Sequence, residues 1–214
     1  MKRREFSLAG ATALASTVIA LPAQAQTKPV ESKDYFDLSN PVAVEVPKGK
    51  IEVIEFFWYS CPHCNAFEPK LEAWIKKAPA DVVIRRVPVA FRDSFVPQQR
   101  LFYTLEALGK LDELHGKVFT TIHAERKPLD REDQILAWAG VNGLDAAKFK
   151  ELYNSFAVST KARKATQAQD AFKVQGVPAL GIAGRYYTDG TTAGTMDRAL
   201  QVTDYLIAEA RKTR

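Results

Sequence analysis

The only two cysteines of this chain, Cys61 and Cys64, stand two residues apart in the stretch Cys61-Pro62-His63-Cys64. Two thiols at this spacing can form a structural disulfide, supply half of a metal site, or exchange electrons with the thiols of another molecule. Covalent haem attachment requires a histidine directly after the second cysteine. This chain has Asn65 at that position, which excludes haem attachment here.

A zinc site is disfavoured by the supply of ligands. Structural zinc takes four ligands, and the cysteine pair supplies two of them. Histidines would have to complete the site, but His63 lies between the cysteines, and His115 and His123 lie far along the chain. We therefore expect no metal and no cofactor other than a Cys61–Cys64 disulfide. A zinc site would show itself as zinc bound to protein purified without chelator.

A reactive role suits the pair better than a structural one. A disulfide that closes so short a loop stabilises a fold by only about 1 kcal/mol in the loop-entropy picture. Pro62 suits the first turn of a helix, because the N–H group that proline lacks would have no partner there. Cys61 would then stand at a helix N-terminus, where unpaired N–H groups and the helix dipole favour a thiolate. His63 adds to this effect, so we predict a low pKa for Cys61 and a disulfide that is easily broken.

A stabilised thiolate is also a good leaving group. A substrate thiolate would attack the sulfur of Cys61 and release Cys64, which leaves a mixed disulfide between substrate and protein. The second thiol of the substrate would then expel Cys61. Two electrons pass to the protein, and the substrate keeps the disulfide.

The segments around the cysteines predict the elements that would position them. Residues 51–58 are apolar on both faces and rich in branched and aromatic side chains, which is typical of a central strand. Residues 62–75 follow as a helix, and residues 82–89 as a second buried strand. Ahead of them, valines alternate over residues 42–46 as in a short strand.

Helical periodicity then dominates residues 93–173, and its last helix is expected to begin near Ser159. Strand patterns return in residues 179–183 and 185–188, joined around Gly184 as a hairpin, and a last helix follows Thr195. This order predicts an α/β thioredoxin fold, a central mixed sheet flanked by helices, with an inserted all-helical domain. The expected division assigns residues 26–92 and 174–214 to the thioredoxin-like domain and residues 93–173 to the insert.

The N-terminus has the layout of a secretory signal peptide. Three basic residues at positions 2–4 precede an uncharged run at 8–21, and an Ala-Gln-Ala motif at 23–25 offers a cleavage site. A membrane anchor is disfavoured, because the run is shorter than the ~20 residues that span a bilayer. We expect residues 1–25 to be removed on export to the periplasm, and residues 26–40 to form a loosely held leader.

Charge gives no indication of a nucleic-acid partner. The chain carries 30 basic and 25 acidic residues, a net charge of +5. Three of these basic residues and one acidic residue lie in the predicted signal peptide, so the mature chain has a net charge of about +3. A surplus this small and this evenly spread does not favour binding to nucleic acid.

These features resemble the DsbA-like thiol-disulfide oxidoreductases of the bacterial periplasm. The resemblance covers nearly all of residues 34–210. It rests on the Cys-Pro-His-Cys stretch after Glu55-Phe56-Phe57, on a helical insert of suitable length, and on Gly176-Val177-Pro178-Ala179. It implies a protein that donates its disulfide to newly exported, unfolded proteins with free cysteines. A quinone-linked membrane oxidase of the DsbB type would then regenerate that disulfide. Apart from the resemblance, the absence of an obvious extra apolar surface in the sequence favours a monomer.

The resemblance also implies a cis peptide bond between Val177 and Pro178, beside the cysteines. From the residues alone, a trans bond would be expected, because most X-Pro bonds in folded proteins are trans. In the family, this bond would present the backbone of Val177 to an extended substrate peptide, in the manner of strand addition. We therefore expect Val177 and Pro178 to bind substrate.

Glu55 is a further candidate, because it shares a strand face with Val53 and Phe57 and should be buried. A desolvated carboxyl has a raised pKa and can move protons to and from Cys64 during exchange. Two other possibilities are that Glu55 reaches water at the end of the strand or that it only pairs with a base. The family often carries a lysine as its partner, and the matching position here holds Arg86, which keeps its charge more firmly than lysine does.

The other conspicuous side chains receive ordinary roles. His115 and His123 are expected to be ordinary surface or core histidines. Trp58, three residues before Cys61, is expected to pack near the site, where its fluorescence would report the redox state.

Two alternative functions remain open. One is a disulfide reductase or isomerase on the same fold, although an isomerase normally needs a dimerisation segment and residues 26–50 look too short for one. The other is a peptide-binding chaperone in which the cysteines are incidental. A protein with Ser in place of both Cys61 and Cys64 would keep the activity of such a chaperone.

Overall fold

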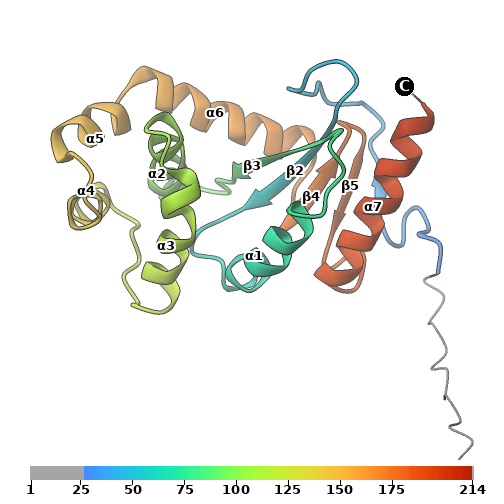
Figure 1. Ribbon diagram of the computed structural model, residues 1–214, viewed down its shortest axis with the longest axis horizontal. Coiled ribbons are helices and arrows are strands. Elements are labelled where there is room, and N and C mark those ends of the chain that lie inside the picture. Colours follow the sequence, from blue (N-terminus) through green and yellow to red (C-terminus); the bar gives the residue numbers. More distant parts are fainter. Residues whose placement is uncertain (1–26, 214) are drawn as a thin grey trace, which may run out of the picture.

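The computed structural model describes residues 27–213 and contains one five-stranded sheet with helices packed on both of its faces (Figure 1). The predicted signal peptide, residues 1–25, lies outside the described residues. The strands are β1 (Phe36–Asp37), β2 (Ile51–Phe57), β3 (Val82–Pro88), β4 (Ala179–Ile182) and β5 (Tyr186–Asp189). The helices are α1 (Pro62–Ile75), α2 (Val96–Ala107), α3 (Leu111–His123), α4 (Glu132–Val141), α5 (Ala146–Tyr153), α6 (Phe156–Ala171) and α7 (Met196–Lys212), with a short 3₁₀ turn, Asp93–Phe95, before α2.

The sheet is mixed, as the sequence predicts. Its strands lie in the order β1-β5-β4-β2-β3, in which β2 and β3 run parallel and the other neighbours run antiparallel. All seven residues of β2 are buried, which confirms the prediction of a central strand covered on both faces. The α/β thioredoxin fold with helices inserted between strands is therefore confirmed.

The two faces of the sheet have separate cores. Helices α1 and α7 cover one face, where Val53 of β2 packs in one cluster with Leu71 and Leu206. The other face is covered by α6 and leads into the group of helices α2–α5, drawn at the left of Figure 1. On that side one apolar cluster continues from Phe56 in β2 to Trp138 in α4. The sheet and the helical segment thus share a core, while the domain limits at 92/93 and 173/174 stay predictions.

The hairpin between β4 and β5 is present where the sequence predicts it. Its turn uses Ala183 and Gly184, both with positive φ, at 54° and 67°. A Cβ atom on Gly184 would lie 2.1 Å from the carbonyl oxygen of Val42, so only glycine fits this turn without movement of the neighbouring backbone. The last helix also begins as predicted, because Thr195 caps α7 by accepting a hydrogen bond from the N–H of Arg198.

Residues 42–46 do not form the predicted strand. They run as irregular chain, and their link to the hairpin is a hydrogen bond from the N–H of Val42 to the carbonyl of Gly184. The two-residue β1 pairs with the edge strand β5 instead, in the register Phe36 opposite Tyr187. Alternating valines suggested a strand, but a strand also needs a neighbour with free backbone groups, and β1 already occupies the edge of β5.

The prediction of a loosely held leader at residues 26–40 is wrong for the described part. Asp34 pairs with Arg198 of α7 at 3.2 Å and accepts a hydrogen bond from the N–H of Val30. The carbonyl of Asp34 accepts a hydrogen bond from Thr188 in β5, and the ring of Tyr35 packs edge-on against Tyr186. Polar composition suggested a loose segment, but its charged groups find specific partners in distant parts of the chain.

Two smaller differences concern α6 and β3. Helix α6 begins at Phe156, earlier than predicted, because Ser155 caps it by accepting a hydrogen bond from the N–H of Val158. Strand β3 is only half-buried along its middle, because it lies at the edge of the sheet with β2 as its neighbour. Within residues 27–213, no helix combines the length and the apolar character needed to cross a membrane.

Candidate active site

The two cysteines lie where β2 gives way to α1. Strand β2 ends at Phe57, a tight turn closes with a hydrogen bond from the N–H of Cys61 to the carbonyl of Trp58, and Pro62 begins the helix. Cys61 occupies the N-cap position of α1, as the sequence predicts. Both cysteines are free thiols and both are buried, with 8% of Cys61 and 0% of Cys64 exposed.

The surroundings of Cys61 favour its thiolate. The hydrogen bond from the Cys64 thiol lowers the pKa of Cys61 to about 6, although burial acts in the opposite direction. The backbone N–H groups of Cys64 and His63 and the charge of the His63 ring also lower this pKa. The partial positive charge of the helix N-terminus acts on the Cys61 sulfur in the same direction.

Cys64 has the opposite character. Burial raises the pKa of the Cys64 thiol far above its usual value, and the hydrogen bond it donates to Cys61 and the charge of Cys61 raise it further. At neutral pH the pair therefore holds one proton, on the sulfur of Cys64. This asymmetry marks Cys61 as the sulfur that reacts and leaves most easily.

Val177 and Pro178 lie beside Cys61, and the peptide bond between them is cis, as the family resemblance implies. The carbonyl oxygen of Val177 lies 3.4 Å from the sulfur of Cys61. A cavity of about 400 Å³ opens next to this contact. Its lining comes from three segments: His63, Gly176, Val177, Pro178, Asp189, Gly190, Thr191, Gly194 and Met196.

Glu55 is buried behind the cysteines, on the face of β2 that packs against α1. Burial raises its pKa to about 8, and the negative charge of Glu68 contributes to the rise, while Arg86 opposes it. Arg86 faces Glu55 directly across the parallel strands β2 and β3 and donates a hydrogen bond to its carboxylate at 3.1 Å. The prediction that Glu55 is buried and that Arg86 is its partner is thus confirmed.

Two further acidic residues join this buried cluster, and the sequence reading missed both. Arg86 also donates hydrogen bonds to Glu68, at 2.8 Å, and to Glu72. Cys64, Glu68 and Glu72 follow one another at four-residue spacing, which places them on one face of α1. That spacing after the second cysteine is the signal by which the cluster could have been found.

The two histidines expected to be surface or core residues both lie in contact with the turn before Cys61. His115 is buried, its Nδ1 atom lies 2.8 Å from the hydroxyl of Tyr59, and its Nε2 atom lies 3.5 Å from the carboxylate of Glu68. Burial lowers the pKa of His115 despite the neighbouring carboxylate. His123 donates a hydrogen bond from Nε2 to the carbonyl of Tyr59, also at 2.8 Å. The sequence does not predict these two contacts, because both depend on how α3 packs against the turn.

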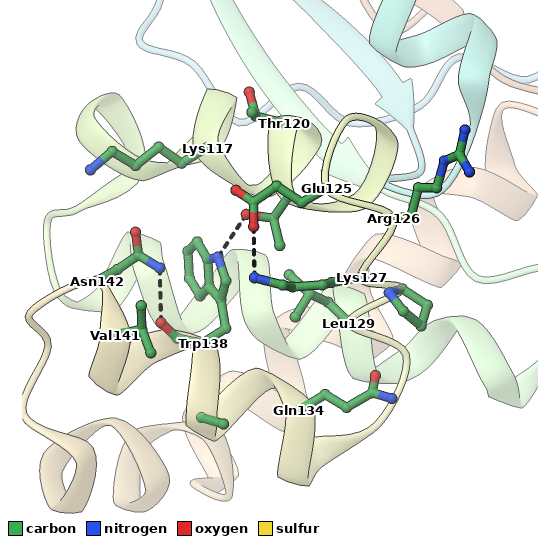
Figure 2. Close-up of a pocket in the computed structure, with 13 residues that line it drawn as sticks. Lys117, Thr120, Glu125, Arg126, Lys127, Leu129, Gln134, Trp138, Val141 and Asn142 are labelled. Carbon is green, nitrogen blue, oxygen red and sulfur yellow. Dashed lines mark hydrogen bonds and ion pairs between the residues drawn. The ribbon is translucent and has the colours of Figure 1, made fainter.

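A larger cavity, of about 630 Å³, lies between α3, α4 and the segment that joins them (Figure 2). Its floor is the ring of Trp138, which donates a hydrogen bond to Thr121 at 3.0 Å. Figure 2 shows the Lys127–Glu125 ion pair beside this ring and the amide of Asn142 bonded to the carbonyl of Trp138. No cysteine lines this cavity, so its walls offer no thiol chemistry.

The part of the chain that the structure describes holds no group of three or more His, Cys, Asp or Glu side chains arranged to bind a metal ion. The ring of His115 lies between the hydroxyl of Tyr59 and the carboxylate of Glu68, at the edge of the buried cluster.

Comparisons with known proteins found similar sequences and similar structures. The family model described as a DSBA-like thioredoxin domain matches residues 86–201. The thiol:disulfide interchange protein DsbA of Bordetella parapertussis is 45% identical over 206 residues, which cover 96% of each chain. The crystal structure of Pseudomonas aeruginosa DsbA matches with a TM-score of 0.80 at 41% identity and covers 85% of this chain and 94% of its own. The structure of the oxidoreductase DsbA from Xylella fastidiosa gives 0.79 at 28% identity, over 86% and 98% of the two chains.

Proposed function

This chain belongs to the DsbA-like family of thiol-disulfide oxidoreductases, and on that premise we propose that Cys61 is the sulfur at which it exchanges disulfides with other proteins. Proteins of this family act through a redox-active cysteine pair and need no cofactor. One observation supports the assignment to Cys61 more than any other. Its sulfur stands at the helix N-terminus beside the carbonyl of Val177, whereas Cys64 is fully buried.

The reaction begins with the Cys61–Cys64 disulfide. A substrate thiolate attacks the sulfur of Cys61, the bond to Cys64 breaks, and a mixed disulfide forms between substrate and Cys61. The second thiolate of the substrate then attacks the substrate sulfur of this mixed disulfide and expels Cys61 as a thiolate. Two electrons have passed from the substrate to the cysteine pair, and the substrate leaves with a disulfide.

Glu55 serves this reaction as a proton donor and acceptor for Cys64. The leaving Cys64 needs a proton, because its thiol is strongly favoured over its thiolate in this buried position. With a pKa of about 8, Glu55 is mostly protonated at neutral pH and can supply that proton. When the pair is oxidised again, the Glu55 carboxylate takes the proton back. Arg86 does not titrate in this range and acts by holding the carboxylate in place.

Substrates bind across the cavity beside Pro178. The carbonyl of Val177 points at the reacting sulfur, and the lining mixes backbone groups with few charged side chains. Such a surface binds an extended peptide through its backbone and reads little of its sequence. This suits unfolded, newly exported proteins with free cysteines as the substrate class.

The cellular setting follows the family. DsbA is a periplasmic family, and residues 1–25 supply the signal peptide that would bring this chain there. A quinone-linked membrane oxidase of the DsbB type takes the electrons from the reduced pair. The protein would work as a monomer, and residues 93–173 would form its inserted helical domain.

The first test is the equilibrium of the mature protein with mixtures of reduced and oxidised glutathione, followed by the fluorescence of Trp58 and checked by thiol alkylation. A reduction potential well above that of glutathione is expected, because a stabilised Cys61 thiolate favours the reduced form. A potential near that of thioredoxin would overturn the oxidant assignment in favour of a reductase on the same fold. Unchanged activity after replacement of both cysteines with serine would point to a chaperone.

A further inference from the structure

The turn that carries Cys61 is held by side chains of the helical segment. The ring of Trp58 stacks on Phe95 with 3.8 Å between the ring centroids and 7° between their planes. Tyr59 is held by the two histidines of α3, described above. The third residue of the turn, Ser60, is held by Gln98 of α2.

Gln98 makes two hydrogen bonds to this turn. It is 2% exposed, and its amide oxygen accepts a hydrogen bond from the N–H of Ser60 at 3.2 Å. Its amide nitrogen donates to the hydroxyl of Ser60 at 2.7 Å and to the carbonyl of Pro128 at 2.9 Å. The side chain thereby ties the residue before Cys61 both to α2 and to the segment between α3 and α4.

The Pro128 end of this link is itself fixed. Pro128 belongs to the segment 124–131, which forms one wall of the cavity in Figure 2. Within this segment Arg126 and Leu129 have positive φ values of 58° and 45°, and Leu129 is 2% exposed. Because a buried leucine anchors this segment, the carbonyl of Pro128 is a fixed hydrogen-bond partner for the amide of Gln98.

The position of Ser60 matters most when the cysteines are reduced. In the oxidised protein the disulfide to Cys64 fixes Cys61 covalently to the first turn of α1. In the reduced protein this bond is gone, and the sulfur stays near the N–H groups of His63 and Cys64 only while the turn keeps its place. Contacts that hold the turn should therefore stabilise the reduced form more than the oxidised form.

We propose that Gln98 is a positioning residue of the disulfide-exchange reaction, which holds the Ser60 turn so that the sulfur of Cys61 stays at the N-terminus of α1 in the reduced protein. The inference rests on the proposed role of Cys61. Its chemical consequence is a shift of the redox equilibrium toward the reduced protein, which makes the disulfide a stronger oxidant.

The neighbouring residue supplies a matched control. Gln99 is an equally buried glutamine of the same helix, 1% exposed. Within residues 27–213 its amide donates hydrogen bonds to the carbonyl of Pro88 at 2.8 Å and to Thr166 at 3.3 Å, and none to the Ser60 turn. Methionine has nearly the volume of glutamine and fills the same space without these hydrogen bonds. The variants Gln98→Met and Gln99→Met thus remove the same groups at two adjacent positions.

We would measure three quantities for each variant: the glutathione equilibrium constant, the pH midpoint of thiolate ultraviolet absorbance, and the melting temperature of the oxidised form. Gln98→Met should shift the equilibrium toward the disulfide by about three- to tenfold, the effect of losing one or two hydrogen bonds. Its thiolate midpoint should move to higher pH. Gln99→Met should lower the melting temperature to a similar extent and leave the other two quantities unchanged.

An unchanged equilibrium and midpoint in Gln98→Met, or equal shifts in Gln99→Met, would overturn the proposal. If Gln98→Met does not fold, Ser60→Ala tests the same contact, because it removes the hydroxyl partner at a half-buried site; a smaller shift in the same direction is expected. Failure of the proposed function is distinguishable, since it would appear in the wild-type protein as an ordinary thiolate midpoint for Cys61.

Discussion

Glu55 and Arg86 occupy opposed positions on the parallel strands β2 and β3, and one carboxylate oxygen of Glu55 accepts a hydrogen bond from the guanidinium at 3.1 Å. The other oxygen is buried and has no hydrogen-bond partner within residues 27–213. Arg86 divides its charge among three carboxylates, so it does not fully compensate the burial of Glu55. The raised pKa of Glu55 follows from this incomplete compensation.

Replacing Glu55 with Gln should stabilise the protein at neutral pH and slow disulfide exchange. The folded state raises the pKa of this carboxyl from 4.5 to about 8, so its contribution to stability is fully present below pH 4.5 and is lost as pH rises through about 8. The Glu55→Gln variant has no carboxyl to ionise, so it should be more stable than the wild-type protein by about 2–4 kcal/mol near pH 8. Urea unfolding of the oxidised forms across the window, together with the rate of exchange with a reduced peptide, checks both effects.

A matched control for this variant is Glu52→Gln. Glu52 is equally buried on the same strand and pairs with Arg85 at 2.9 Å, but it points to the opposite side of β2 from Glu55. The Glu52→Gln variant should change the stability of the fold without slowing disulfide exchange at the cysteines. Equal slowing in both variants, or unaltered exchange in Glu55→Gln, would contradict a proton role for Glu55.

The reduced protein should gain stability relative to the oxidised protein as pH rises. The folded state lowers the pKa of Cys61 from 9.0 to about 6, so the thiolate contributes its full stabilisation above pH 9.0 and loses it as pH falls through about 6. Allowing for screening by solvent, this stabilisation of the reduced protein is on the order of 2 kcal/mol. Melting temperatures of both forms between these pH values measure it, and a difference that stays constant with pH would contradict the lowered pKa.

Serine replacements should separate the two cysteines. Cys61→Ser removes the reacting sulfur, so no mixed disulfide with a substrate should form. Cys64→Ser keeps that sulfur but removes the thiol that would resolve the intermediate, so mixed disulfides at Cys61 should accumulate. Mass spectrometry after incubation with a peptide disulfide distinguishes the two variants. If mixed disulfides accumulated in Cys61→Ser instead, Cys64 would be the reacting sulfur and the proposed assignment would be wrong.

Replacing His63 with Ala should weaken the thiolate only in part. The ring of His63 is one of several groups that lower the pKa of Cys61, and the hydrogen bond from Cys64 and the backbone N–H groups remain in the variant. The thiolate midpoint should therefore rise and still stay below that of an ordinary cysteine. Titration by ultraviolet absorbance checks this, and a midpoint equal to that of an unfolded peptide would show that His63 is the main cause.

Much of this protein follows from its sequence alone. The Cys-Pro-His-Cys stretch after an apolar strand predicts a reactive thiolate at a helix N-terminus, because local chain geometry is enough to place Cys61 at the end of α1. The apolar pattern of residues 51–57 predicts a buried central strand, and hence a buried Glu55. Both predictions depend on residues that are close together in the sequence.

Contacts between distant segments were decided only by the tertiary structure. Valine alternation at residues 42–46 predicted a strand, yet β1 pairs with β5 because edge pairing depends on which segment reaches the free backbone groups. Glu68 joins Glu55 through Arg86, and Gln98, His115 and His123 reach the turn before Cys61 from helices 30 or more residues away. No periodic pattern or characteristic spacing in the sequence predicts such contacts, because they arise from the packing of α2 and α3 against the sheet.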